Sequence, residues 1–183
     1  LPGTVRHDPL LGKDLLFLLA EGHLLALDKK EGRLHWKAEA GHVGTPSGLV
    51  WVAGDLLIAT AKEGDLLGLR QADGKILWRM KLGSGSFPSA VLACGKLVTL
   101  GSEGPMRAID LKSGSVVWTR ERKGMGRFGL MAAGNRLLCP RGHELSCLDA
   151  CSGKRLWHVA KAHFDGNRCL DGDTLYSAGY RFV

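Results

Sequence analysis

The stretch Ala26-Leu27-Asp28-Lys29-Lys30-Glu31-Gly32-Arg33-Leu34-His35-Trp36 is the first of four related copies in this 183-residue chain. Its pattern is small-x-Asp-x-x-x-Gly-x-x-x-Trp, and the later copies end at Trp78, Trp118 and Trp157, in steps of 42, 40 and 39 residues. A period near 40 residues is typical of repeat architectures in which each unit buries its core only against its neighbours. The chain is therefore expected to be an array of one structural unit.

The residues of the motif are expected to be structural. An Asp can bond its own following backbone in a turn, a Gly permits a positive φ, and a Trp supplies a large apolar surface with one N–H that needs a partner. The residues assigned to this structural role are Asp28, Gly32, Trp36, Gly74, Trp78, Asp110, Gly114, Trp118, Asp149, Gly153 and Trp157. The second copy carries Arg70 at the Asp position, so its blade is expected to be less well tied together.

The segments between the motifs are short apolar runs punctuated by Gly, Asp and Asn, which is typical of strands separated by turns. No glycine-free segment of ten or more residues has helical apolar spacing, so helical-pair repeats are rejected. Four antiparallel strands per repeat of about 40 residues predict an all-β chain, a β-propeller of four-stranded antiparallel blades. The chain is read as one segment, 1–183, with blades at about 4–38, 48–81, 87–121, 127–160 and a partial one at 164–183.

Four complete blades and half of a fifth do not close a ring neatly. Three arrangements follow from this count: a fragment of a larger ring, an open arc, or association with another chain. The missing blades would then come from the rest of a longer chain or from a second copy. The sequence therefore predicts a partial propeller and leaves ring closure open.

The motif resembles the PQQ-like (quinoprotein-type) repeat of β-propellers over almost the whole chain. The resemblance implies that each Trp docks between adjacent blades. Such repeats occur in the propeller lipoprotein of the outer-membrane β-barrel assembly machinery and in sensor domains fused to kinases. Quinoprotein dehydrogenases hold their quinone with an adjacent Cys-Cys disulfide and a calcium ion; this sequence has no adjacent Cys-Cys pair, and nothing marks calcium ligands. No cofactor is expected.

No stretch of the sequence indicates catalysis. The seven histidines form no H-x-x-x-H or H-E-x-x-H pair. Gly83-Ser84-Gly85-Ser86 fails the G-x-S-x-G signature, and no phosphate-binding glycine loop is present. The sequence therefore predicts no catalytic, cofactor-binding or metal-binding residues.

The net charge of +7 is dispersed, with one local concentration in the link between the third and fourth blades. The cations of that link are Arg120, Arg122, Lys123 and Arg127, which could hold a phosphate or carboxylate surface. Aromatic residues for base stacking are missing from the link except for Phe128 at its end, so nucleic-acid binding is disfavoured. These cations are the candidate partner-binding residues.

The five cysteines include no C-x-x-C pair, so zinc spacing is absent. Cys139 and Cys147 flank a turn and could form one disulfide in an oxidising compartment such as the periplasm or the secretory route. Free buried thiols in a reducing compartment such as the cytoplasm are favoured over that alternative. No apolar run is long enough for a transmembrane segment, and the start at Leu1 fits either a removed leader or a fragment. The compartment stays open.

The function expected from these patterns is a non-catalytic binding module that presents loops to a protein partner. The contact surface is expected at the interblade links Ala40–Ser47, Gly83–Pro88, Arg122–Arg127 and Ala162–Gly166. One alternative is a piece of a quinoprotein enzyme or of a sensor that binds a small molecule in the propeller channel. A lesser alternative is binding of an anionic surface or nucleic acid through the basic link.

Overall fold

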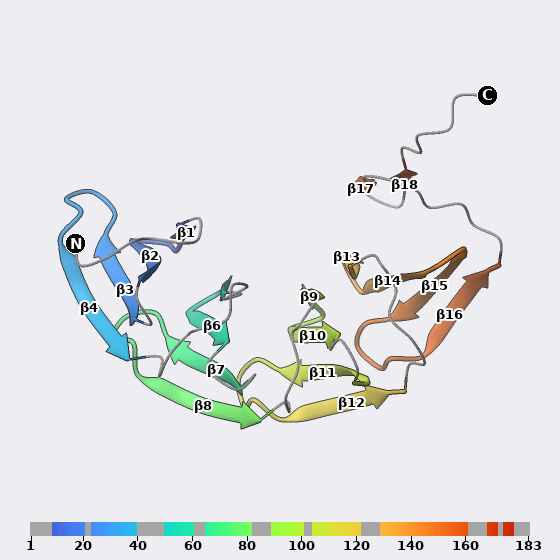
Figure 1. The fold of residues 1–183 in the computed structure, drawn as a ribbon, viewed down its shortest axis with the longest axis horizontal. Coiled ribbons are helices and arrows are strands. Elements are labelled where there is room, and N and C mark those ends of the chain that lie inside the picture. The colour runs from blue at the N-terminus through green and yellow to red at the C-terminus, as the bar shows by residue number, and fades with distance from the viewer. Residues whose placement is uncertain are drawn as a thin grey trace. The chain divides into compact units, whose positions relative to one another are not determined.

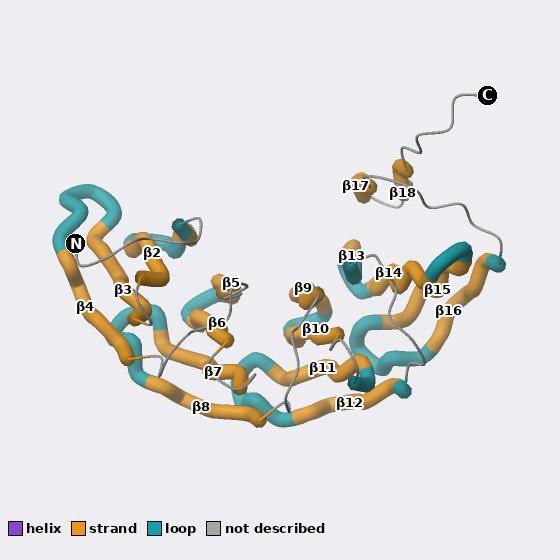
Figure 2. The backbone as a smooth tube through the Cα atoms, viewed as in Figure 1, coloured by secondary structure: helices purple, strands orange, loops and turns teal. Residues whose placement is uncertain are grey.

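The computed structural model describes residues 9–20, 23–39, 50–60, 65–81, 89–100, 104–121, 129–160, 168–171 and 174–177. Within these ranges the chain consists of strands, turns and loops without a helix (Figures 1 and 2). Four antiparallel four-stranded sheets follow one another along the sequence, each a meander of consecutive strands. The prediction of an all-β chain of four-stranded propeller blades is confirmed. Within the described part, nothing helical is long and apolar enough to cross a membrane.

The strands of each sheet are consecutive along the chain. The first sheet contains β1 Leu10–Leu11, β2 Leu15–Ala20, β3 His23–Asp28 and β4 Leu34–Glu39; the second contains β5 Val50–Ala53, β6 Leu56–Thr60, β7 Asp65–Arg70 and β8 Ile76–Lys81. The third contains β9 Ser89–Ala93, β10 Lys96–Leu100, β11 Met106–Asp110 and β12 Val116–Arg120; the fourth contains β13 Met131–Ala133, β14 Arg136–Arg141, β15 Glu144–Asp149 and β16 Arg155–Val159. A two-stranded sheet of β17 Arg168–Asp171 and β18 Thr174–Ser177 follows.

The chain divides into two compact units. The first comprises Leu1–Ser86 together with Leu111–Ser115, and the second comprises Phe87–Asp110 together with Val116–Val183. The turn Leu111–Ser115, which follows β11 along the chain, thus belongs to the first unit by its contacts. Each unit therefore contains two complete four-stranded sheets.

In the first unit, a core fills the space between the sheets β1–β4 and β5–β8. Phe17, Leu24 and Ala26 from the first sheet meet Leu57 and Leu67 from the second. Alternation along each strand sends every second residue toward this core, as expected for sheets packed face to face. The apolar residues of the other face of the first sheet, Leu18, Leu25 and Leu27, form a separate cluster.

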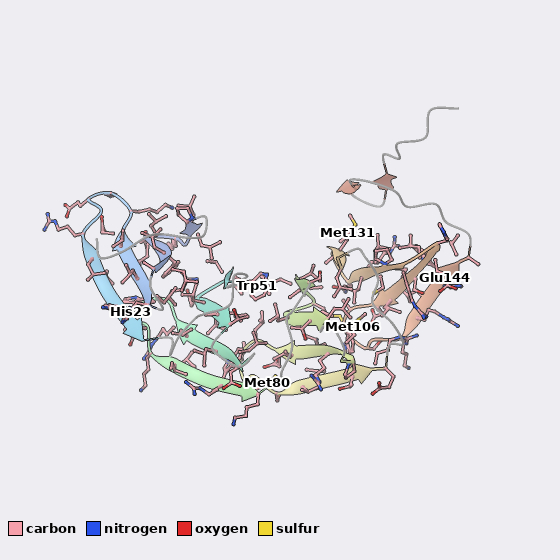
Figure 3. The ribbon with its side chains drawn as sticks, viewed as in Figure 1. His23, Trp51, Met80, Met106, Met131 and Glu144 are labelled. Atoms are coloured by element: carbon pink, nitrogen blue, oxygen red, sulfur yellow. A yellow bond between two sulfur atoms is a disulfide. The ribbon has the colours of Figure 1, made fainter. Side chains whose placement is uncertain are left out.

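In the second unit, an equivalent core lies between the sheets β9–β12 and β13–β16. Met106 in Figure 3 belongs to this core, with Val98 and Ala108 from its own sheet and Leu137 and Leu148 from the other sheet. The opposite face of the β13–β16 sheet carries a smaller cluster of Leu138, Leu145 and Cys147, with Met131 packed against it. Both faces of this sheet are thus apolar.

Candidate functional site

The Asp and Gly of the motif close the turn between the third and fourth strands of a blade. In the first blade, Asp28 Oδ1 accepts hydrogen bonds from the backbone N–H groups of Lys30 at 2.9 Å and Glu31 at 2.8 Å. The N–H of Gly32 donates to the carbonyl oxygen of Asp28 at 2.9 Å, and Gly32 has a φ of +67°. This left-handed conformation favours glycine because it has no Cβ. These bonds hold the turn between β3 and β4.

The same turn is kept in the second blade, although Arg70 replaces the Asp. Gly74 N–H donates to the Arg70 carbonyl at 2.9 Å, as in the first blade. The carboxylate comes instead from Asp73, which accepts from Arg70 Nε at 3.0 Å and from the Lys75 N–H at 3.1 Å. The buried Gln71 adds two bonds from Nε2, to the carbonyl oxygens of Gly54 and Leu56. The expectation of a more loosely tied blade is wrong, because Asp73 and Gln71 replace the missing contacts.

The small residue that begins the motif lies across the strand pair from the Trp of its own blade. Ala26 pairs with Trp36, and Gly68 pairs with Trp78. A Cβ at Gly68 would collide with the indole of Trp78. The register shifts after this pair in every blade, so the residue before the Trp forms a β-bulge on the outer strand. The spacing from Gly to Trp in the motif thus includes one bulge residue.

Each of the first three motif tryptophans reaches the turn of the following copy. Trp36 Nε1 donates to the carbonyl oxygen of Gln71 at 2.7 Å, and Trp78 Nε1 donates to that of Leu111 at 2.8 Å within the first unit. Trp118 Nε1 donates to the Ala150 carbonyl at 3.0 Å within the second unit. The acceptor is always the residue after the Asp position of the motif. The N–H that an indole must satisfy on burial is therefore used to tie one blade to the next.

The motif glycine of the following copy forms the surface on which each of these indoles rests. A Cβ at Gly74 would lie 2.7 Å from the Trp36 ring, and a Cβ at Gly153 would lie 2.8 Å from the Trp118 ring. Any side chain at these positions would displace the indole. The glycine therefore serves twice, once for its positive φ and once for the close approach of the ring.

The comparisons with known proteins agree with this blade geometry. The family model described as outer membrane protein assembly factor BamB matches residues 1–86. The structure is similar to that of BamB from Moraxella catarrhalis, with a TM-score of 0.69 and 18% identity over 94% of this chain. The chain is built of PQQ-like propeller blades. No curated protein matches it by sequence.

Two further solved structures share the arrangement of these PQQ-like blades. The computationally designed Ika8 protein has a TM-score of 0.73 at 11% identity over 92% of this chain. The quinohemoprotein alcohol dehydrogenase ADHIIG from Pseudomonas putida HK5 has a TM-score of 0.64 at 16% identity over 84% of this chain. The chain spans 54% of the BamB and Ika8 chains and 34% of the dehydrogenase. At these low identities, the structural similarity shows the fold alone.

The fourth PQQ-like motif differs from the other three in its surroundings. Trp157 on β16 is 42% exposed, whereas Trp78 is 8% exposed. Within the described ranges its Nε1 forms no hydrogen bond of the kind made by the other three. The Asp149 turn of the same blade is nevertheless complete, because Asp149 Oδ1 accepts from the Ser152 N–H at 2.7 Å and from the Ser152 hydroxyl at 2.6 Å. These bonds lower the pKa of Asp149, the hydroxyl bond most strongly.

Of the four cations proposed to contact a partner, only Arg120 falls within the described residues. Its Nη1 donates to the carbonyl oxygen of Gly153 at 3.2 Å and so reinforces the junction made by Trp118. The other three cations, Arg122, Lys123 and Arg127, lie outside the described residues. The four interblade links expected to form the contact surface lie outside them as well. Partner binding by these cations stays a prediction.

The cysteines are arranged differently from the sequence-based expectation. Cys139 and Cys147 are buried free thiols, and the pairing of Cys139 with Ser146 and of Leu138 with Cys147 puts them on opposite faces of the hairpin. Cys139 and Cys147 are thus free, as favoured from the sequence, whereas a disulfide that the sequence analysis did not foresee joins Cys94 to Cys151 in the second unit. A disulfide of this kind is characteristic of oxidising compartments.

This disulfide joins turns at the same end of two neighbouring sheets. Cys94 lies in the turn between β9 and β10 with a φ of 51°, and Cys151 lies in the turn between β15 and β16. Within a blade these two kinds of turn are bonded together, as the Ala150 N–H to Asn135 carbonyl bond of 2.7 Å shows. The sequence signal that could have revealed this pair is the position of each cysteine within its repeat. Cys94 follows the first strand of its blade and Cys151 follows the third strand of its own, so both lie in turns at the same end of their sheets.

The described histidines and acidic residues do not converge on a site. Among the described residues, no group of three or more His, Cys, Asp or Glu is placed to hold a metal ion. His23 begins β3, as Figure 3 shows, and His143 lies in the β14–β15 turn. His158 Nδ1 lies 3.2 Å from the Ser146 hydroxyl across the strand pair, in an exposed position. These three histidines lie on different strands and turns of the blades.

Proposed function

We propose that this chain is a non-catalytic protein-interaction module, in which PQQ-like blades hold loops rigidly for a protein partner. The observation that carries the proposal is that the repeated motif is occupied by structural contacts. Asp28 and Asp149 close turns, and Trp36, Trp78 and Trp118 tie blades together. The polar groups of the repeated motif are thus used in contacts that build the blades.

The topology of each blade places the motif turn at one end of the sheet and the link to the next blade at the other end. In an antiparallel meander, the turns after the first and third strands lie at one end of a sheet, and the turn after the second strand lies at the other. The link to the next blade leaves from that other end. Within each four-stranded blade the motif turn therefore lies at one end, and the fourth strand ends at the opposite end. The Cys94–Cys151 disulfide joins turns at the motif end of the third and fourth blades.

A rigid scaffold favours recognition by this second end. Loops held at both ends by strands lose little conformational entropy when they bind a partner. Net charge of +7 over the chain would speed the association with an acidic partner. The similarity to BamB, described as an outer membrane protein assembly factor, supports a role in holding other proteins.

The alternative is a piece of a quinoprotein enzyme or small-molecule sensor. The similarity in fold to the quinohemoprotein alcohol dehydrogenase supports it, at 16% identity. Within the described part of the chain, no group of three or more His, Cys, Asp or Glu is placed to hold a metal ion. The experiment described next distinguishes this enzyme or sensor from a protein-interaction module.

Site-specific photocrosslinking in the native host tests the proposal. A photoreactive residue replaces Lys123 or His163 in two links, and matched control proteins carry it at Lys30 or Asn135 in turns at the motif end. Crosslinks to one protein from the link positions and not from the controls are expected. Crosslinking from the motif end alone would contradict the proposal. Stoichiometric uptake of pyrroloquinoline quinone with calcium by the purified chain would favour the enzyme or sensor instead.

A further inference from the structure

Cys94 occupies a backbone position that two other blades give to glycine. It lies in the turn between β9 and β10 with a φ of 51°. Gly54 and Gly134 follow the first strands of the second and fourth blades in the same way, with φ of 57° and 53°. The left-handed conformation is unfavourable for a residue with a Cβ and no polar group that bonds the local backbone. The cysteine is therefore explained by its side chain and not by the turn.

The bonded cysteines and the free cysteines of the second unit lie in different surroundings. Cys94 and Cys151 are partly exposed residues of turns, whereas Cys139 and Cys147 are buried thiols on strands. Access of the attacking thiolate is one of the factors that set the rate of thiol–disulfide exchange. The disulfide is thus placed where a thiol from solvent can approach it.

The ammonium group of Lys96 lies beside one of the two bonded sulfurs. Lys96 Nζ is 3.7 Å from Cys94 Sγ and donates a 3.1 Å hydrogen bond to the Cys94 carbonyl oxygen. No described cation makes a contact of this kind with the sulfur of Cys151. A neighbouring cation stabilises a thiolate, and the sulfur that forms the more stable thiolate leaves faster. Cys94 is therefore the better leaving group of the pair.

The disulfide is one of three ties between the third and fourth blades. Trp118 Nε1 donates to the Ala150 carbonyl oxygen at 3.0 Å, and Arg120 Nη1 donates to that of Gly153 at 3.2 Å. Cys151 lies between these two acceptors in the same turn. Breaking the disulfide leaves both hydrogen bonds in place, so the joint can loosen while the blades stay packed.

We propose that the Cys94–Cys151 disulfide is a thiol-exchange site, through which the redox state of the surroundings adjusts the joint between these two blades. A thiolate attacks the sulfur of Cys151, the sulfur–sulfur bond breaks, and its electron pair leaves on Cys94 beside Lys96. A second thiolate attacks the entering sulfur of this mixed disulfide and releases Cys151. Two thiols are thus oxidised to one disulfide, and their two protons are taken up by Cys94 and Cys151. This site is separate from the protein partner proposed above.

Reaction of the folded chain with reduced glutathione tests which sulfur is attacked. Products are trapped at short times with N-ethylmaleimide and located by mass mapping. Glutathione on Cys151 with trapped Cys94 should exceed the opposite product at least about threefold, because the leaving sulfur is the one beside the cation. The buried Cys139 and Cys147 serve as internal controls that the chain is folded. An adduct mainly on Cys94, or no reaction until denaturant is added, would overturn the proposal.

The variant Lys96→Met removes the ammonium group and keeps an unbranched side chain. Its rate of reduction at neutral pH should fall at least about threefold. Lys75→Met removes the same charge from a turn of the second blade and should react as the wild type does. Mercaptoethanol, which lacks the charged groups of glutathione, should show the same ratio of rates. An unchanged rate in Lys96→Met would contradict the assigned leaving group.

Thioredoxin, used at the same thiol concentration as glutathione, distinguishes the source of the thiol. Faster reduction by thioredoxin would assign the thiol to a protein, and faster reduction by glutathione would assign it to a small molecule. Either result requires that the folded chain reacts, so a disulfide resistant to both reagents would overturn the proposal.

Hydrogen exchange measures the effect of reduction on the joint. The backbone N–H groups of Ala150 and Gly153 are bonded within the fourth blade, and they should exchange at least about fivefold faster after reduction. The N–H of Gly74, bonded in the same way in the first unit, should exchange at an unchanged rate. Circular dichroism should show a folded chain in both states. Equal exchange before and after reduction, or global unfolding on reduction, would refute the adjustable joint.

Discussion

Trp36 Nε1 donates a 2.7 Å hydrogen bond to the carbonyl oxygen of Gln71, thirty-five residues further along the chain. The same bond recurs from Trp78 to Leu111 and from Trp118 to Ala150. In each case the indole also lies on the glycine of the turn that it reaches. One repeated contact thus combines apolar burial with a satisfied N–H, and it explains why the motif has a Trp rather than another aromatic residue.

Replacing Trp36 by Phe should lower the free energy of unfolding by about 1–3 kcal/mol, because the Gln71 carbonyl loses its donor while the apolar contact is largely kept. Urea denaturation measures the change. Trp157→Phe is the matched control, and it should change stability by less than about 0.5 kcal/mol, as for other exposed sites. Equal losses at the two positions would contradict a special role for the junction bond.

Gly153→Ala should be more destabilising than Gly134→Ala, although both glycines have positive φ, +72° and +53°. Forcing Ala into the left-handed region costs about 1–2 kcal/mol at either site. At Gly153 the new methyl group would also strike the Trp118 ring, whereas nothing lies within 4 Å of Gly134. The additional loss should be about 1–3 kcal/mol, as for overpacking. Thermal unfolding of the two variants gives the comparison directly.

Removal of the Cys94–Cys151 disulfide should destabilise the second unit. The bond closes a loop with a sequence separation of 57. A loop of this length corresponds to about 4 kcal/mol in the chain-entropy description of the unfolded state. Cys151→Ala should therefore unfold at lower denaturant than the oxidised wild type. After reduction, the wild type should match the variant; a difference that persists would point to another effect of the substitution.

Acid should weaken the motif turn through Asp149. The Ser152 hydroxyl and N–H bonds hold the pKa of this carboxyl below its ordinary value of 3.8. A group with a lowered pKa in the folded state stabilises the fold above its unfolded pKa, and this contribution is lost as the pH falls through the folded pKa. The stability difference between wild type and Asp149→Asn should therefore be greatest near neutral pH and shrink below about pH 4.

Carbon-13 NMR titration of the Asp149 carboxyl supplies the control for this assignment. Ser152→Ala removes the hydroxyl donor, so the measured pKa of Asp149 should rise toward 3.8 in that variant. An unchanged pKa of Asp149 would show that the hydroxyl bond is not its main cause.

The free thiols Cys139 and Cys147 should resist alkylation in the folded chain. Both are buried, and desolvation raises the pKa of Cys147, which lowers its thiolate fraction at neutral pH. Iodoacetamide followed by peptide mass mapping should modify neither residue until denaturant is added. Modification of Cys147 at the rate of an exposed thiol in the native chain would contradict its placement.

The strand plan could be predicted from the sequence because its signals are local. Short apolar runs between Gly, Asp and Asn turns predicted four strands within 87–121, and the structure has β9 to β12 there. The second blade was predicted less well, since the loss of the motif Asp at Arg70 was visible and its replacement by Asp73 was not. The candidate contact loops were chosen because they link blades, and the candidate cations because of their local charge; the role of both in binding is still a prediction.

The sequence by itself determined the repeat, the number of strands in each blade and the positive φ turns. These depend on backbone preferences of Asp and Gly and on alternation along a strand, which act over a few residues. Only the tertiary structure decided which residues meet between blades: the indoles with Gln71 and Ala150, and Cys94 with Cys151. Such contacts join residues about 30 to 60 positions apart, so they exist only once whole sheets have packed.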